Sequence, residues 1–162
     1  MMKGYSYNKE NIKEIAFARN DNINASYKDL IAVCDAIRNK SVNEAIKLLD
    51  SIINEHKPIE YKKHNKHMGA RHELNGKKGA YPIKAAKAVK KVLANAIANA
   101  EEKDIDVDNA FVVHASANKS RVELRYPPRG SLYWGRGQYH MRIMHSNLTW
   151  ARVEIGIANK VV

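Results

Sequence analysis

The sequence lacks the residues and patterns that define several common classes of protein. Cys34 is the only cysteine among 162 residues, which excludes an internal disulfide and a cysteine-based zinc site. No stretch approaches the ~18 consecutive apolar residues of a membrane span. The first ten residues, MMKGYSYNKE, also lack the apolar segment of a signal peptide. We therefore expect a soluble, cytoplasmic chain with no membrane partner, in which Cys34 is a small buried apolar residue.

Carboxylates are also scarce, and their distribution is uneven. The chain has 17 Asp and Glu against 28 Lys and Arg, a net charge of +11, and none of the carboxylates lies between Glu123 and Glu154. Residues 61–100 carry ten basic side chains and a single acidic one, Glu73, whereas residues 1–60 are balanced. Residues 101–118 are acidic. So strong and segregated an excess of cations indicates a polyanionic partner, for which nucleic acid is the default.

Two helices are predicted in the first third of the chain. The first begins at Ser26, whose side chain is expected to cap the exposed amides, with Asp29 in the first turn. Ser41 and Glu44 form a capping box at the start of the second, which ends before Pro58. Apolar residues follow each start at helical spacing, so each helix has one face suited to a core.

A basic loop and a third helix are predicted next. Residues 61–80 mix lysines and histidines with glycines and show no apolar period, which is typical of a long loop. Pro82 fits the first position of an alanine-rich helix that runs to about Glu102. Lys84, Lys87 and Lys91 recur at spacings of three and four, so they line one helix face that is a candidate for binding phosphate.

The last third of the chain reads as a long β-hairpin. Its arms run from near Phe111 to Tyr126 and back from Tyr139, each roughly 50 Å long at ~3.3 Å per residue. A domain of this size does not need so long a hairpin for its core, so the distal part is expected to project or to lie on a partner. A strand at about residues 14–19 could join the hairpin base.

These segments predict one α+β domain spanning residues 1–162. We expect three helices packed on a small three-stranded antiparallel sheet, with a basic loop at 61–80 and a long extended β-hairpin at about 111–155.

Two patterns resemble metal sites without satisfying their spacing. The histidines near the loop, His56, His64, His67 and His72, are not at i, i+4 on a helix, so we interpret them as solvated or RNA-contacting residues. The Asp104, Asp106 and Asp108 series imitates a calcium loop, but Asn109 occupies the place of the turn glycine and Ala115 that of the closing glutamate. We expect no metal and no other cofactor.

The chain also lacks a recognisable catalytic motif. There is no nucleophile elbow, phosphate-cradling loop or pair of acids in an apolar setting, so we expect no enzyme. Arginine guanidinium groups and lysines beside aromatic and histidine side chains favour the binding of folded RNA with unstacked bases. The alternatives are a metal-dependent nuclease that uses the histidines and a nucleoid protein, although no recognition helix is evident.

Several segments resemble those of a known family. They are SYKDLIAVCDAIRNKSVNEAIKLLDSI at Ser26–Ile52, KHNKHMGARH at Lys63–His72 and YPIKAAKAVKKVLANAIANAE at Tyr81–Glu101, followed by the basic hairpin. The stretch YPIKAAKA after a His/Lys/Gly loop is the most specific of these. Over nearly its whole length the chain is similar to the large-subunit ribosomal protein L22 family, in its archaeal and eukaryotic branch.

This resemblance implies a structural role in the large ribosomal subunit. Family members bind large-subunit ribosomal RNA, support subunit assembly and extend a hairpin tip to the wall of the peptide exit tunnel. The implied partners are that RNA, neighbouring ribosomal proteins and, at the tip, the nascent peptide, with no homo-oligomer. A free-standing RNA-binding or RNA-chaperone module is the alternative.

The resemblance also assigns residues by position. The rRNA contacts would be Lys62, Lys63, His64, Lys66, His67, Arg71, His72, Lys77, Lys78, Lys84, Lys87, Lys91, Lys119, Arg121, Arg125, Arg129, Arg136 and Arg142. The tunnel tip would be Pro128, Arg129, Gly130, Ser131, Leu132, Tyr133, Trp134, Gly135 and Arg136. The family tip commonly ends in Gly-Arg-Ala, whereas this chain has Gly135-Arg136-Gly137 after an added aromatic pair, Tyr133 and Trp134.

Overall fold

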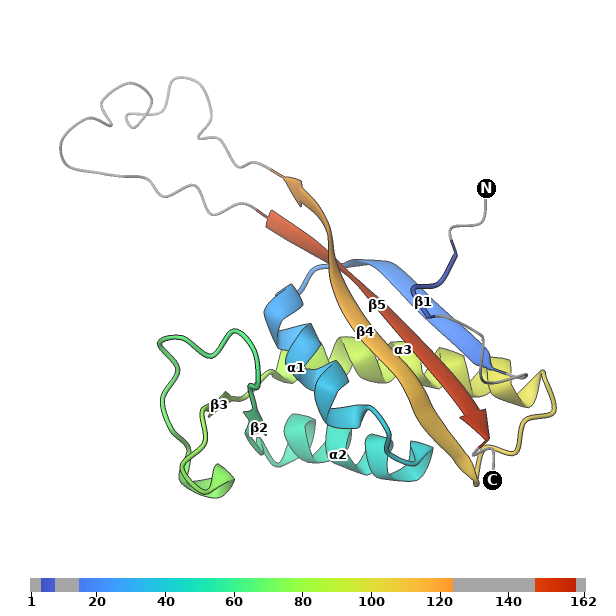
Figure 1. The fold of residues 1–162 in the computed structure, drawn as a ribbon, viewed down its shortest axis with the longest axis horizontal. Coiled ribbons are helices and arrows are strands. Elements are labelled where there is room, and N and C mark those ends of the chain that lie inside the picture. The colour runs from blue at the N-terminus through green and yellow to red at the C-terminus, as the bar shows by residue number, and fades with distance from the viewer. Residues whose placement is uncertain (1–3, 8–14, 124–147, 160–162) are drawn as a thin grey trace.

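A three-stranded antiparallel sheet in the order β1-β5-β4 supports three helices. The computed structural model describes residues 4–7, 15–123 and 148–159. The strands are β1 (Ala16–Ile23), β4 (Ala110–Glu123) and β5 (Leu148–Asn159). The helices α1 (Tyr27–Ile37), α2 (Val42–Asn54) and α3 (Ile83–Glu101) lie on one face of the sheet (Figure 1). The predicted α+β class and its three-stranded sheet are confirmed.

The core lies between the sheet and the helices. The central strand β5 contributes Ala151, Val153, Ile155 and Ile157, which alternate along the strand and are fully buried. They share one apolar cluster with buried residues of all three helices. The cluster also contains Cys34, which is 1% exposed and free, as predicted. Burial raises the pKa of its thiol to about 12.

The helix starts match the sequence patterns with two differences. Ser41 Oγ accepts the Glu44 amide at 3.3 Å, so this half of the expected capping box is present. The expected side-chain cap at Ser26 is wrong: Ser26 is the N-cap, but only its carbonyl is used, accepting from Leu30 N at 3.0 Å. Pro82 is likewise the N-cap of α3 rather than its first residue, because its ψ of 59° is not helical.

Both edges of the sheet are covered near the core. On β4, the main chain at Asn39 and Lys40 pairs with Val112 at 2.8 and 2.9 Å. At the start of β1 and just before it, the Phe17 and Ile15 carbonyls accept from Asn99 Nδ2 and Lys103 Nζ of the segment at the end of α3, at 2.9 and 2.8 Å. Such cover prevents the edges from pairing with another chain. The predicted early strand is present as β1, displaced towards Ile23.

The hairpin of β4 and β5 extends beyond this body. Every residue from Asn118 to Val122 is exposed, and the last described pair is Glu123 with Leu148 (Figure 1). The register shifts between Lys119 and Arg121, which marks a bulge where the hairpin leaves the core. The predicted extension is therefore confirmed as far as Glu123. The rest of the predicted arms, at 124–147, lies outside the described residues.

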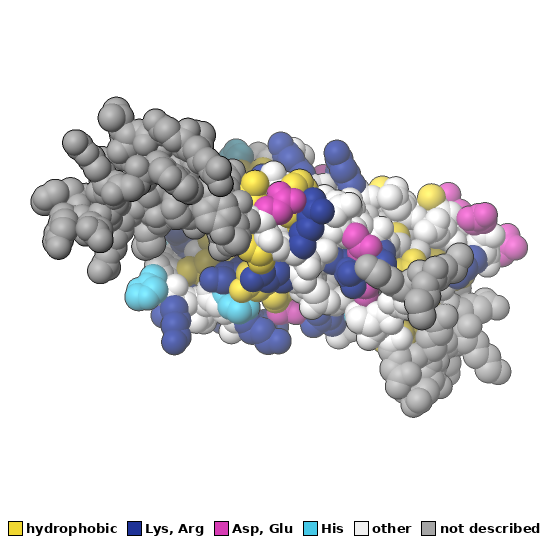
Figure 2. Space-filling view, turned by 90° about the horizontal axis from the view of Figure 1, so that it is seen from above, with side chains coloured by type: hydrophobic (Ala, Val, Ile, Leu, Met, Phe, Trp, Pro, Cys, Tyr) yellow, Lys and Arg dark blue, Asp and Glu magenta, His cyan; other side chains and the backbone are white. Residues whose placement is uncertain are grey.

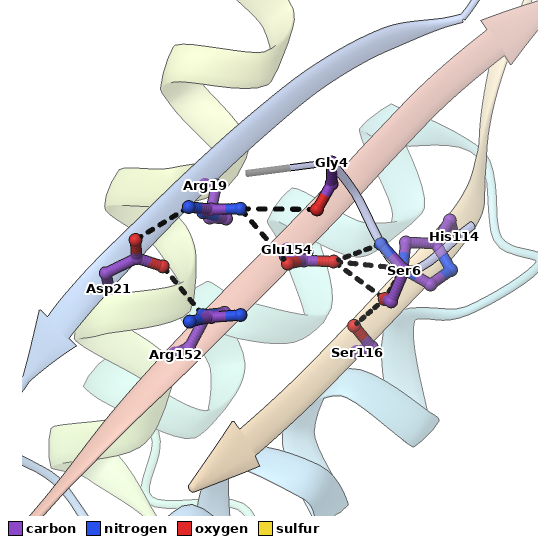
Figure 3. A network of polar contacts seen from close by, with 8 residues as sticks. All are labelled: Gly4, Ser6, Arg19, Asp21, His114, Ser116, Arg152 and Glu154. Atoms are coloured by element: carbon purple, nitrogen blue, oxygen red, sulfur yellow. Dashed lines mark hydrogen bonds and ion pairs between the residues drawn. The ribbon is translucent and has the colours of Figure 1, made fainter. Parts of the chain in front are cut away.

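The second face of the sheet carries a polar network instead of helices (Figure 3). At its centre, Glu154 accepts hydrogen bonds from the main-chain N and the Oγ of Ser6 at 2.9 and 2.7 Å. Arg19 Nη1 and His114 Nε2 lie 3.8 and 3.9 Å from the same carboxylate. The segment 4–7 is thereby held across the sheet.

Candidate nucleic-acid interface

The basic loop at 61–80 is anchored to α1 through its first residues. Tyr61 is 1% exposed and donates its hydroxyl proton to Asp29 Oδ1 at 2.8 Å. Burial and, after it, this hydrogen bond raise the pKa of Tyr61. The His64 ring meets the edge of Tyr27 at 5.8 Å between centroids. The N-terminal end of α1 thus fixes where the loop leaves the body.

Inside the loop the chain has more regular structure than the sequence predicts. A two-stranded ribbon pairs β2 (Ile59–Glu60) with β3 (Gly79–Ala80), and a 3-10 turn, η1, spans His72–Leu74. Arg71 donates from Nε to the Gly79 carbonyl at 3.0 Å, and its guanidinium lies 5.0 Å from the Tyr81 ring centre. The predicted long loop is therefore present, but the short ribbon and the 3-10 turn were not predicted, because main-chain pairing leaves no apolar period in the sequence.

The loop presents its cations to solvent. Lys77 pairs with Glu60 Oε2 at 3.0 Å, and Arg71 is half-buried by the contacts just described. The other predicted RNA contacts of the loop are exposed and make no ion pair within the part of the chain that the structure describes: Lys62, Lys63, His64, Lys66, His67, His72 and Lys78. Most of the loop charge therefore remains available to an anionic partner.

The lysines of α3 extend this surface. Lys84, Lys87 and Lys91 are exposed, whereas Lys90 pairs with Asp50 of α2 at 2.5 Å. The first turn of α3 holds no acid and its last turn no base, although the helix dipole favours acids at the start and bases at the end. The partial positive charge of the helix start adds to that of the lysines. This placement therefore favours the binding of an anion but does not stabilise the helix.

At the hairpin base, Lys119 and Arg121 are exposed on β4. Arg121 pairs with Glu123 at 2.8 Å, and its guanidinium lies 5.3 Å from the centre of the Trp150 ring on β5. The structure therefore places one predicted contact beside an aromatic platform. The remaining hairpin contacts and the whole tip lie outside the described residues: Arg125, Arg129, Arg136, Arg142 and Pro128 to Arg136.

The charges are polarised along the molecule. The basic loop, the first half of α3 and the projecting hairpin lie at one end, and the turn after α3 lies at the other (Figure 1). That turn exposes Glu101, Glu102, Asp104, Asp106 and Asp108, and carboxylates are visible at the right-hand end of Figure 2. Asp106 accepts from Asp108 N and Asn109 Nδ2 at 3.1 and 2.7 Å, and these bonds close the turn.

Other kinds of site find little support within the described residues. No three His, Cys, Asp or Glu side chains there gather closely enough to hold a metal ion. No helix in that same part of the chain is long and apolar enough to cross a membrane.

Three asparagines near this surface are absent from the sequence predictions. Asn20, Asn22 and Asn24 line a cavity together with Lys84, Lys87 and Lys91. Their period of two over the end of β1 and the residue that follows it was the available signal, but it points to a site only when β1 is placed beside α3. Trp150 was also missed, because its contact with Arg121 depends on the hairpin register.

An α+β body with a projecting hairpin and one cation-rich end defines the class of this protein: a small basic α+β protein with an exposed cationic surface. The family described as "Ribosomal protein L22p/L17e" matches residues 18–147. A "Large ribosomal subunit protein uL22" of Archaeoglobus fulgidus is 43% identical over 126 residues, covering 77% of this chain and 81% of the relative. Its namesake in Sulfurisphaera tokodaii is 40% identical, covering 79% and 86%. The chain belongs to this ribosomal protein family of the large subunit.

This membership confirms the resemblance noted in the sequence. Members of the family are structural proteins of the large ribosomal subunit, a cytoplasmic particle, and they are not enzymes.

Proposed function

We propose that this chain binds large-subunit ribosomal RNA through its cation-rich end and supports assembly of the subunit. The observation that carries the proposal is the exposure of the loop lysines and of Lys84, Lys87 and Lys91 on α3, among which only Lys77 pairs with a described carboxylate. Lysines and arginines that neutralise phosphates release counterions, and this supplies much of the affinity for RNA. The acidic end is then left for solvent or for basic neighbours among the ribosomal proteins.

The hairpin extends the proposal to the exit tunnel. β4 and β5 already leave the body at Asn118, with Lys119 and Arg121 exposed along the arm. We infer that the arms bind RNA and that residues 128–136 reach the tunnel wall and the nascent peptide. A photoreactive group attached at Ser131→Cys in assembled ribosomes should crosslink to a stalled nascent chain, whereas the same group at Asn43→Cys on α2 should not. If neither position crosslinks to the nascent chain, the proposed tunnel role is wrong.

Salt dependence of binding tests the RNA proposal. The full chain is titrated with transcribed large-subunit rRNA between 50 and 200 mM salt. A protein that makes 6–10 phosphate contacts loses roughly 10³- to 10⁵-fold in affinity over this range. Changing Lys62, Lys63 and Lys66 to Gln should lower the slope of log Kd against log salt by about 2–3. A wild-type Kd that does not respond to salt would overturn the proposal.

The matched control removes the same charge from lysines that are not among the predicted RNA contacts. Lys40, Lys47 and Lys57 lie on or beside α2. Their triple change to Gln should alter the slope much less than the loop variant does. Equal changes in both variants would mean that the RNA senses only net charge.

A further inference from the structure

An open groove, with a cavity volume of about 260 Å³, lies between the end of β1 and the first half of α3. One wall consists of ammonium groups from α3, and the other consists of amide side chains from β1 and the residue that follows it. Ile23, Ala25 and Ala88 also line it, so its base is apolar. No carboxylate is among the residues that line the cavity.

The lysine wall is positively charged and unneutralised. Lys84, Lys87 and Lys91 are exposed, and none forms an ion pair with any residue that the structure describes. Lys90, one position from Lys91, is instead paired with Asp50 on the α2 side of the helix. The helix therefore separates a lysine that holds α2 from three lysines whose charge faces the cavity.

The asparagine wall is uncharged and can both donate and accept hydrogen bonds. Asn20, Asn22 and Asn24 are exposed and alternate with Asp21 and Ile23. Asn20 Oδ1 accepts the main-chain N–H of Asn22 at 3.1 Å, so the Nδ2 donors are the end of this amide left for a ligand. The wall is thus suited to hydroxyl groups rather than to phosphate alone.

We propose that this groove binds one strand of RNA backbone, with phosphates toward the α3 lysines and ribose hydroxyls toward the β1 asparagines. The inference rests on the proposed binding of large-subunit rRNA and adds a defined path for the strand. Phosphate contacts fix position, and the 2′-hydroxyl is the backbone group that distinguishes RNA from DNA. A groove with one cationic and one amide wall matches both sides of such a backbone.

Two triple variants test the two walls separately, with transcribed large-subunit rRNA as the probe. Changing Lys84, Lys87 and Lys91 to Gln should lower the slope of log Kd against log salt by about 2, from ~0.7 for each phosphate on a single strand. Changing Asn20, Asn22 and Asn24 to Ala should weaken binding on the order of tenfold with the slope unchanged, because no charge is removed. An unchanged Kd and slope in both variants would overturn the proposal that the groove binds RNA.

A tethered cleavage reagent locates the strand. An Asn22→Cys variant is labelled with iron-EDTA, and Cys34 stays unlabelled because it is buried and its thiol pKa is raised to about 12. Hydroxyl radicals from position 22 should cut one short stretch of bound rRNA, whereas the reagent at Asn43→Cys, an exposed asparagine of α2, should not cut there. Absence of this cut in a complex that still forms would overturn the inference.

The outcomes separate the two proposals. If wild-type protein does not bind the rRNA with a steep salt dependence, the proposed function fails. If wild type binds and the loop variant lowers the slope, while both groove variants and the Asn22→Cys reagent behave like their controls, only the groove fails. Circular dichroism of each variant establishes that it is folded before binding is measured.

Discussion

Glu154 is the only charged residue buried in the described part of the chain, at 1% exposure. Its carboxylate is compensated by Ser6, by Arg19 and by the nearby His114 ring (Figure 3). The aromatic ring of Tyr5 stacks on Phe17 at 4.5 Å, which adds an apolar contact to the same segment. A buried carboxylate with these partners holds residues 4–7 against the sheet.

His114 in this network predicts a pH dependence of stability. Burial lowers the pKa of His114, an effect opposed by Glu154 and reinforced by Arg38. Ser6 Oγ lies 3.3 Å from its Nε2, and the Tyr7 ring packs 5.2 Å away between centroids. Between the unfolded pKa near 6.5 and the lower folded value, the unfolded chain binds more protons. The free energy of unfolding should therefore fall as the pH drops through this window.

Urea unfolding at pH 7.5 and 5.5 measures the effect. His114→Gln should lose less free energy of unfolding over this interval than wild type does. His72→Gln, which changes an exposed histidine of η1, should retain the wild-type dependence. A His114→Gln profile that parallels wild type would mean that other groups cause the pH response.

Among the elements, the β2–β3 ribbon determines the shape of the basic loop. At Gly79 an added Cβ would lie 2.5 Å from the Ile59 carbonyl oxygen and would collide with Leu74 Cδ1. Gly79→Ala should therefore separate the two strands and lower the free energy of unfolding by about 1–3 kcal/mol. Amide hydrogen exchange at Tyr61 and Arg71, whose main-chain N–H groups bond to Lys78 and Lys77, should rise as well.

Gly69 in the same loop is the matched control. No atom lies within 4 Å of a Cβ added there. Gly69→Ala should change the free energy of unfolding by no more than about 0.5 kcal/mol. If both alanines destabilise alike, glycine flexibility rather than close packing explains the loop.

The elements also show how far local sequence patterns reach. The three helices were predictable because caps and apolar periods act within a few residues, as at Ser41 and Glu44. The ribbon and the network around Glu154 were not, because they join residues distant in the chain: Ser6 and Glu154 are 148 positions apart. The candidate interface was predicted through its charges, whereas its asparagine wall required the packing of β1 beside α3.

For the molecule as a whole, the charges are arranged for a partner more than for the isolated fold. Lysines gather at the start of α3 and in the adjoining loop, where they repel one another and oppose the helix dipole. The apolar core is instead confined to the body, and it ends on β4 at Ala117. The apolar core and the proposed binding surface thus use different side chains.

This separation predicts that the hairpin can be shortened without loss of the fold. Since Glu123 pairs with Leu148, residues 124–147 can be replaced by an Asn-Gly turn that closes a two-residue hairpin. The main apolar cluster of the body is formed by described residues outside this segment, so the free energy of unfolding should change by no more than about 1 kcal/mol.

The shortened chain should still bind rRNA through the loop and α3. Its salt slope should be lower, because Arg125, Arg129, Arg136 and Arg142 are removed. Loss of cooperative unfolding would show that the segment is needed for folding, and an unchanged slope would show that its arginines do not contact phosphate.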